Sequence, residues 1–265
     1  MKYEGKVTLV TGGSHGIGEG CVRVFAEAGS TVVFCSRGEK DGKALEHEVN
    51  ARGPGRALFL RCDVSKEAEV RALVDETAKR FGRIDCLVNN AGWHPPHRPI
   101  DGFTAQDLRD LLELNLVSAF VACQQALPHL RRTQGSIINI SSLVGSIGQL
   151  HGTTYVATKG ALTAFSKALA VDEAAHGVRV NSVSPGNCLD AAVERVRRHH
   201  RRSRGGASGG RGSAAPGPDG HDRGGGAALP LPGHRGDLHD RRRPRPVGRS
   251  GAGLRTEKPR GLMSR

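Results

Sequence analysis

Residues 6–18 of the chain read KVTLVTGGSHGIG, a short apolar run followed by four glycines within seven residues. The pattern predicts a buried strand that turns on glycine into a helix, whose apolar face carries Val22, Phe25 and Ala26. In this context the glycines let a phosphate group approach the N–H groups at the helix N-terminus. We therefore predict a dinucleotide-binding turn, with these residues at the cofactor: Gly12, Ser14, Gly16, Ile17 and Gly18.

The alternation of strand and helix continues to residue 187. Apolar runs at 31–35, 57–61, 86–89, 136–140 and 178–183 predict further strands, and the segments between them carry apolar side chains at helical spacing. Strands that alternate with helices form a parallel sheet with both faces covered. We expect an α/β fold, a doubly wound parallel sheet of the Rossmann type with three αβα layers, whose ligands bind at the carboxyl edge of the strands.

Small and polar residues follow several of these strands at that edge. Ser36 and Arg37 stand where an acidic residue would hold the ribose of NAD, and the arginine instead suits the 2′-phosphate of NADP. Asp63 either accepts from an adenine amino group or caps the helix that begins after Ser65. The cofactor is thus NAD or NADP, and the other expected contacts are Val64, Asn90, Ala91, Gly92, Tyr155, Lys159, Pro185 and Gly186.

A second informative stretch, residues 139–159, reads NISSLVGSIGQLHGTTYVATK. Tyr155 and Lys159 are one helical turn apart and share a helix face, and Ser142 follows a predicted strand. A phenol titrates near pH 10, and a neighbouring ammonium lowers its pKa. We predict Tyr155 as acid/base and Ser142 as the hydroxyl that holds the substrate oxygen. A packed tyrosine and a solvated lysine are the alternative, and the dinucleotide turn upstream argues against it.

Three further polar residues have two interpretations each. His94 and His97 lie in a proline-rich loop that leaves the same sheet edge, and each either reaches the substrate or is an exposed loop histidine. Asn115 is a polar residue among leucines, and a buried asparagine must be hydrogen-bonded. It either braces its helix or holds a water in a proton path to Lys159.

The charge of the chain is divided unevenly along its length. Residues 1–187 hold 21 Lys+Arg and 19 Asp+Glu, whereas residues 188–265 hold 18 and 7, which gives that segment most of the net charge of +13. Residues 188–265 also contain 17 Arg, 16 Gly and 7 Pro, and no Phe, Tyr, Trp or Ile. Such a segment cannot bury enough apolar surface to offset its ordering entropy. We expect a globular domain over 1–187 and a non-globular segment over 188–265.

Cysteine usage and hydropathy restrict the class of protein. The six cysteines form no CxxC pair and lie mostly in apolar contexts, so we expect reduced thiols in a cytoplasmic protein and no metal site. No signal peptide is expected at the N-terminus, and no apolar run is expected to reach the length of a membrane span.

Taken together, the residues resemble the short-chain dehydrogenases/reductases. The resemblance rests on TGxxxGxG at 11–18, NNAG at 89–92, Ser142, YxxxK at 155–159 and PG at 185–186, and it ends at about residue 187. It implies Tyr155 as acid/base, Ser142 as the orienting hydroxyl, Lys159 as the residue that lowers the tyrosine pKa and holds the ribose, and Asn115 as a water anchor. A finer match over residues 89–96, 111–116 and 142–149 implies substrate contacts at His94 and Gln149 and a cytosolic, tetrameric, NAD-dependent enzyme acting on 17β-hydroxysteroids or L-fucose. Ser36 and Arg37 depart from that pattern.

The segment after residue 187 departs from the family altogether, and we interpret it as a shifted reading frame. When codons are read one base later, residues 189–193 permit WTPLW and residues 231–241 permit FLATEATFMTG, and both resemble family sequence in the right order. An alcohol dehydrogenase by descent is therefore the first hypothesis, and an inactive dinucleotide-binding protein is its alternative. A nucleic-acid binder with an arginine-rich tail is the rival, but that tail lacks aromatic residues to stack on bases.

Overall fold

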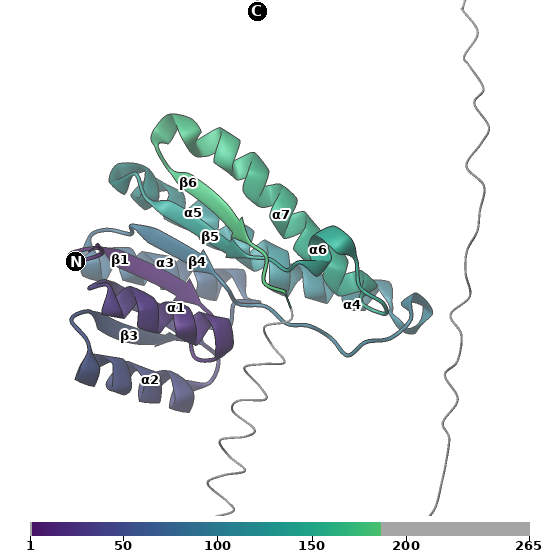
Figure 1. The fold of residues 1–265 in the computed structure, drawn as a ribbon, viewed down its shortest axis with the longest axis horizontal. Coiled ribbons are helices and arrows are strands. Elements are labelled where there is room, and N and C mark those ends of the chain that lie inside the picture. The colour runs from purple at the N-terminus through teal and green to yellow at the C-terminus, as the bar shows by residue number, and fades with distance from the viewer. Residues whose placement is uncertain (1, 187–265) are drawn as a thin grey trace, which may run out of the picture. The chain divides into compact units, whose positions relative to one another are not determined.

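A computed structural model describes residues 2–186 of the chain; the predicted tail over 188–265 lies outside the described residues. Within them the strands form one parallel sheet in the order β3-β2-β1-β4-β5-β6 (Figure 1). The bounds are β1 Val7–Thr11, β2 Thr31–Ser36, β3 Arg56–Arg61, β4 Cys86–Asn89, β5 Ser136–Ile140 and β6 Arg179–Val183. The order reverses between β1 and β4, and this switch point creates the crevice that doubly wound sheets use for ligands.

Helices cover both faces of the sheet, which confirms the predicted three-layer fold. On one face, α1 (Gly16–Glu27) and α2 (Glu39–Arg52) pack Val22, Ala26, Leu45 and Val49 against the sheet. On the other face lie α3 (Glu67–Phe81), α5 (Ser118–Thr133) and α7 (Thr153–Glu173). Shorter elements complete the described chain: η1 Ile100–Gly102, α4 Ala105–Leu112, the π-helical turn η2 Glu113–Val117, α6 Val144–Ile147 and η3 Ala174–His176.

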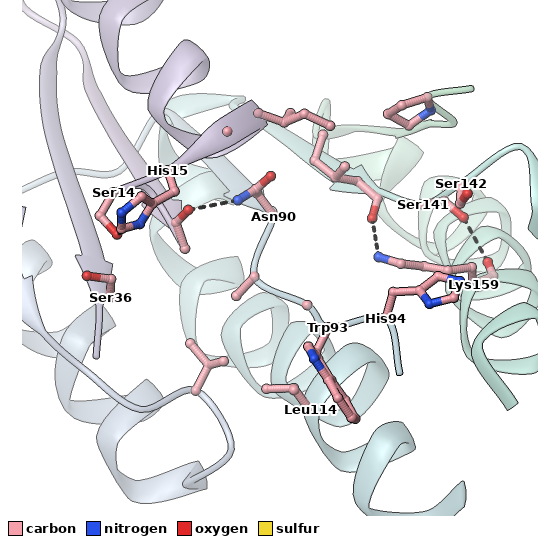
Figure 2. Close-up of a pocket in the computed structure, with 18 of the residues that line it drawn as sticks. Ser14, His15, Ser36, Asn90, Trp93, His94, Leu114, Ser141, Ser142 and Lys159 are labelled. Carbon is pink, nitrogen blue, oxygen red and sulfur yellow. Dashed lines mark hydrogen bonds between the residues drawn. The ribbon is translucent and has the colours of Figure 1, made fainter. Parts of the chain in front are cut away.

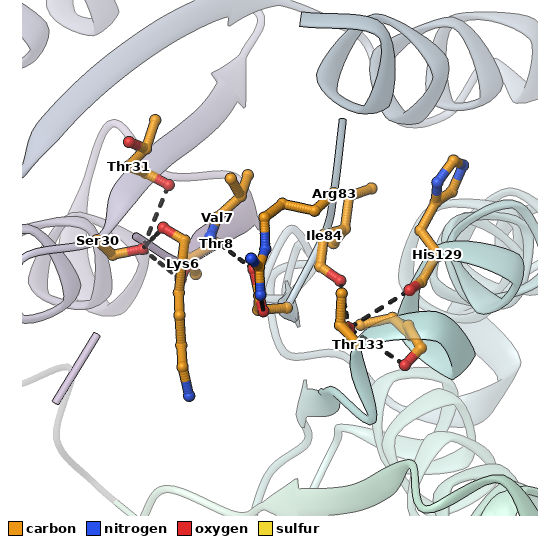
Figure 3. A network of polar contacts seen from close by, with 11 residues as sticks. Lys6, Val7, Thr8, Ser30, Thr31, Arg83, Ile84, His129 and Thr133 are labelled. Carbon is orange, nitrogen blue, oxygen red and sulfur yellow. Dashed lines mark hydrogen bonds and ion pairs between the residues drawn. The ribbon is translucent and has the colours of Figure 1, made fainter. Parts of the chain in front are cut away.

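Polar contacts fasten the amino ends of the central strands (Figure 3). The buried Asp85 carboxylate accepts the Val7 N–H at 2.9 Å and also pairs with Arg83. Nearby, the hydroxyl groups of Thr8 in β1 and of Ser30, just before β2, are hydrogen-bonded at 2.9 Å. These bonds satisfy polar groups that burial would otherwise leave unpaired, at a cost of about 1–3 kcal/mol each. They fix the strands at the end opposite the crevice.

The helical run Ala105–Thr133 corrects one expectation from the sequence. It is long and apolar enough, at a mean hydropathy of 1.2, to pass the length and composition test for a membrane span, so the expectation that no such run exists is wrong. Core helices of soluble proteins pass the same test. In the structure Val121, Cys123, Ala126 and Leu130 of this run are buried in the core beside α3, which accounts for its hydropathy.

Beyond the last paired residues of β5 and β6, the two segments remain hydrogen-bonded to each other. The Ser141 N–H donates to the Val183 carbonyl at 2.8 Å, and the Leu143 N–H donates to the Pro185 carbonyl at 3.0 Å. These bonds continue the ladder into the loops that follow the strands, where Ser142 lies.

Candidate active site and dinucleotide cleft

A cavity of about 480 Å³ opens at the carboxyl ends of the strands (Figure 2). Its wall contains most of the residues that the sequence predicted for the cofactor and for catalysis. The predicted residues that line it are Gly12, Ser14, Gly16, Ile17, Ser36, Arg37, Asp63, Val64, Asn90, Ala91, Gly92, His94, Ser142, Tyr155, Lys159, Pro185 and Gly186. The predicted residues Gly18, Asn115 and Gln149 do not line the cavity, but each lies next to a residue that does: Gly12, Trp93 and His94, respectively.

The glycine turn is shaped by close backbone contacts. Gly12 and Gly16 have φ values of +64° and +56°, which disfavour any residue with a Cβ. A Cβ at Gly18 would lie 2.2 Å from the Gly12 carbonyl oxygen and 2.4 Å from the Asn90 amide nitrogen. The Asn90 amide in turn donates to the carbonyls of Thr11 and Gly12 at 3.1 and 3.0 Å. Gly18 therefore lets helix α1 approach the turn, and the open space above the turn suits a pyrophosphate.

The end of the cavity formed by β2 and β3 carries no carboxylate at the ribose position. The Ser36 hydroxyl donates to the Gly38 carbonyl at 3.0 Å, and Arg37 is exposed at the cavity wall. Asp63 accepts from the N–H and the hydroxyl of Ser65 at 3.1 and 2.8 Å. The predicted helix cap is wrong, because α3 has Lys66 at its N-cap and Asp63 instead closes the turn before it.

Asn115 lies in the π-helical turn and is almost completely buried. Its side-chain oxygen accepts the Trp93 N–H at 2.8 Å, and its amide donates to the Trp93 carbonyl at 3.0 Å and the Thr158 hydroxyl at 3.1 Å. Asn115 thus braces the loop after β4 against helix α7, which confirms the bracing interpretation. Its role as a water anchor stays a prediction.

Lys159 is buried beneath the cavity, with 4% of its surface exposed. Its Nζ donates to the Ile140 carbonyl at 2.7 Å, a bond drawn in Figure 2. Burial lowers the pKa of Lys159 to about 8, because an ammonium is costly to remove from water. A substantial fraction of this lysine is therefore neutral at mildly alkaline pH.

The pKa of Tyr155 shifts in the direction opposite to the one expected. Burial raises the pKa of Tyr155, and a hydrogen bond with Ser142 opposes that shift. Lys159 Nζ lies 5.8 Å from the centre of the Tyr155 ring and donates to the backbone instead. The prediction that Lys159 lowers the pKa of Tyr155 is wrong for the protein alone, because the ammonium is held by the Ile140 carbonyl. Burial raises the pKa of the phenol more than the contact with Ser142 lowers it.

The predicted substrate residues His94 and Gln149 are brought together at the cavity mouth. The His94 ring lies 4.2 Å from the Tyr155 ring, centre to centre, and its Nε2 lies 3.1 Å from the Gln149 side-chain oxygen. The Gln149 amide nitrogen lies 3.2 Å from Nε2 of His97. All three residues therefore belong to one polar cluster beside Tyr155.

Several wall residues escaped the sequence interpretation: His15, Cys62, Trp93, Leu114, Ile140 and Ser141. Ser141 is held by bonds to the Lys159 carbonyl at 2.8 Å and to the Thr163 hydroxyl at 2.7 Å. His15 lies within the glycine turn and pairs with Asp41 at 3.3 Å. Ser141 and His15 each lie next to a residue that the sequence predicted for the site. That adjacency could have indicated them, but it does not show which of two neighbouring side chains faces the cavity.

Known proteins show the family to which the chain belongs. Residues 6–201 match the short chain dehydrogenase family. The chain is 56% identical over 186 residues to the L-fucose dehydrogenases of Oryctolagus cuniculus and Bos taurus, covering 70% of this chain and 64% and 67% of theirs. It thus spans slightly less than two thirds of the first of these relatives.

Two solved structures of similar fold contain a nicotinamide dinucleotide. An NAD⁺-bound xylitol dehydrogenase is similar at 31% identity with a TM-score of 0.67, covering 70% of this chain and 72% of its own. A 3-ketoacyl-(acyl-carrier-protein) reductase from Brucella melitensis, complexed with NADH, is similar at 30% identity with a TM-score of 0.65, covering 69% and 75%. With its cleft at the switch point of a parallel sheet, the chain belongs to the short chain dehydrogenase family.

Proposed function

We propose that the chain interconverts a secondary alcohol and the corresponding carbonyl compound, with Tyr155 as the acid/base. The observation that carries this proposal is that Ser142, Tyr155 and Lys159 line the same cavity as the glycine turn. Two adjacent hydroxyl groups can hold one substrate oxygen, and the more acidic of them, the phenol, exchanges its proton. A nicotinamide dinucleotide held at the glycine turn and Lys159 would supply the hydride in reduction and accept it in oxidation.

The roles of the side chains follow from their positions. Ser142 holds the substrate oxygen, and the phenolic oxygen of Tyr155 accepts the proton in oxidation and returns it in reduction. Lys159, beneath the cavity, holds the cofactor ribose and adds positive charge when protonated. The glycine turn at residues 12–18 holds the pyrophosphate, which is anionic and suits a helix N-terminus.

For the substrate we propose an L-fucose-like sugar or a 17β-hydroxysteroid. The two L-fucose dehydrogenases support the sugar, and the donors and acceptors of His94 and Gln149 suit several sugar hydroxyls. The exposed Leu143 and Ile147 near the same mouth offer apolar surface to a steroid. A cytoplasmic location and a homotetramer are further parts of this proposal.

For the cofactor we propose a preference for NADP(H), carried by the exposed Arg37 and the absence of a carboxylate at position 36. Ser36→Asp should move the preference toward NAD, because a carboxylate repels the 2′-phosphate and accepts from ribose hydroxyls. Fluorescence titration with NADH and NADPH measures both affinities. Tighter binding of NADH by the parent, by about tenfold or more, would overturn this preference.

The function is tested by following NAD(P)H absorbance with L-fucose and with a 17β-hydroxysteroid. Tyr155→Phe should abolish turnover while leaving dinucleotide binding nearly unchanged, and Ser142→Ala should lower the rate by about 10²-fold or more. Ser146→Ala, exposed on α6, is the matched control. The variants are compared in the 265-residue chain and in a chain whose frame is restored after residue 187. Sustained turnover by Tyr155→Phe would refute the assignment.

A further inference from the structure

The strands at the two edges of the sheet, β3 and β6, differ in what covers their outer backbone groups (Figure 1). At the β3 edge, side chains of helix α2 bond to them. Asn50 accepts the Ala57 N–H at 2.8 Å and donates to the Ala57 carbonyl at 2.9 Å. Glu46 accepts the Phe59 N–H at 3.2 Å. Such bonds keep an edge strand from pairing with another chain.

The β6 edge has no such covering within residues 2–186. The Arg179 N–H donates to the Gly135 carbonyl at 3.1 Å, and the Val183 carbonyl accepts the Ser141 N–H at 2.8 Å. Because successive residues of a strand direct their backbone groups to opposite sides, the odd-numbered residues of β6 bond to β5. The even-numbered residues direct their N–H and C=O groups away from the sheet: Val180, Ser182 and Ser184. No described residue bonds to these outer groups.

A groove of about 390 Å³ lies between this open edge and helix α7. Val180 and Ser182 line it from β6, and Ser166 and Ala170 line it from α7 with small side chains. The Ser182 Oγ is buried and has no hydrogen-bond partner among the described residues. A buried hydroxyl without a partner is unfavourable, so a strand that pairs with β6 gains if it brings a polar group to this position.

A second copy of the chain has such a group at the matching position. Two copies related by a two-fold axis bring the same strand together in antiparallel orientation. With the axis at Ser182, the two Ser182 residues stand opposite each other as a hydrogen-bonded pair, with Cα atoms about 5.5 Å apart. Opposed serine hydroxyls can bond to each other, and Val180 of each copy faces Ser184 of the other.

The charges at the edge favour this occupant over the segment that follows residue 187. Arg179 is the only charged residue of β6. In this register it faces Pro185 of the other copy, so the two arginines lie about 20 Å apart, beyond the Debye length of about 8 Å. A second copy brings one further lysine to the groove, the exposed Lys167. Residues 188–265 would instead bring 18 Lys+Arg against 7 Asp+Glu to Arg179 and Lys167.

We propose that β6 pairs with β6 of a second copy, antiparallel and centred on Ser182, so that two sheets become one continuous sheet. Backbone groups at the open edge then find partners, as they do in other complexes formed by strand addition. This interface deepens the homotetramer proposed above by naming one of its contacts. It does not depend on the proposed reaction.

Sedimentation equilibrium of the 265-residue chain measures the mass of the assembly against the 28.1 kDa of one chain. Ser182→Pro removes an outer N–H and no bond to β5, which proline allows on an edge strand. This variant should halve the mass with an unchanged circular dichroism spectrum. Ser182→Thr keeps the N–H and a hydroxyl and should keep the parent mass.

Two results of that experiment would overturn the proposal. One is a parent that stays monomeric throughout the micromolar range, as expected if residues 188–265 or another protein covered the edge. The other is an assembly whose mass Ser182→Pro leaves unchanged, which would place the interface elsewhere and leave the homotetramer standing. A halved mass in a chain without any turnover would support the interface and refute the proposed reaction.

Cysteine cross-linking tests the register without a proline. In a chain with Cys188→Ser, mild oxidation should join Ser182→Cys chains into disulfide-linked dimers, since a disulfide needs Cα atoms about 4.4–6.8 Å apart. Asn181→Cys is the matched control. It faces Val183 of the other copy, so its own counterpart lies about two residues further along, beyond that range. Absence of cross-linking by Ser182→Cys, or equal cross-linking of both variants on a non-reducing gel, would contradict the pairing.

Discussion

Replacing Lys159 with methionine should stabilise the chain at neutral pH, although Lys159 lines the candidate active site. Burial lowers the pKa of Lys159 from 10.5 to about 8. Each pKa unit corresponds to about 1.4 kcal/mol, so the buried ammonium costs about 3 kcal/mol at pH 7. Methionine removes that cost but also removes the bond to the Ile140 carbonyl, worth about 1 kcal/mol. The variant should therefore be more stable by about 2 kcal/mol at pH 7.

The pH dependence distinguishes this cause from general packing. Between pH 8 and 10.5 the unfolded chain keeps the proton that the folded chain has lost, so the free energy of unfolding of the parent rises with pH. The advantage of Lys159→Met should shrink over that interval and reverse near its upper end.

Urea unfolding followed by circular dichroism at several pH values measures the difference between parent and variant. Lys167→Met, exposed on the same helix, is the control and should give no such trend. A difference that stays constant from pH 7 to pH 10.5, or a parent more stable than Lys159→Met at pH 7, would refute the reasoning.

Three other predictions concern the turn, an ion pair and the tail. Gly18→Ala, with a Cβ 2.2 Å from the Gly12 oxygen, should weaken NADH binding in a fluorescence titration by about tenfold or more, whereas Gly20→Ala meets nothing within 4 Å and should bind normally. Arg131 lowers the pKa of the buried Glu173, so the ion pair stabilises the folded chain while the carboxylate is charged. Glu173→Gln should therefore lower the free energy of unfolding, measured in urea, by about 1 kcal/mol above pH ~4.3, and this loss should disappear as the pH falls below that value. An unchanged cost at pH ~3 would contradict that cause. Restoring the frame after residue 187 should raise NAD(P)-dependent turnover, and equal activity of both chains would contradict the frameshift.

The sequence was sufficient for the fold because its periodicities are local and consistent. Each apolar run became a strand, and Val70, Leu73 and Val74 of α3 are buried as their spacing predicted. The glycine turn was equally predictable, since glycine is favoured by the left-handed backbone at Gly12 and by the close approach at Gly18.

The electrostatics of the site could not be read in the same way. Tyr155 and Lys159 are one helical turn apart, yet the Lys159 ammonium turns to the Ile140 carbonyl, which lies on another element. Which acceptor the Lys159 ammonium binds depends on the distances that the fold sets between elements, and these distances cannot be derived from the spacing of residues in the sequence. The polar cluster of His94 and His97 was hidden for the same reason, because Gln149 reaches both from a separate loop.

The bonds from Ser141 to Val183 and from Leu143 to Pro185 have a consequence for Ser142, which lies between them. The Ser142 backbone, held between two rungs, cannot shift unless the loop after β6 shifts with it. Any displacement of residues 183–185 therefore reaches the Ser142 backbone without crossing the sheet. The backbone position from which that hydroxyl extends is set jointly by two stretches of chain more than forty residues apart.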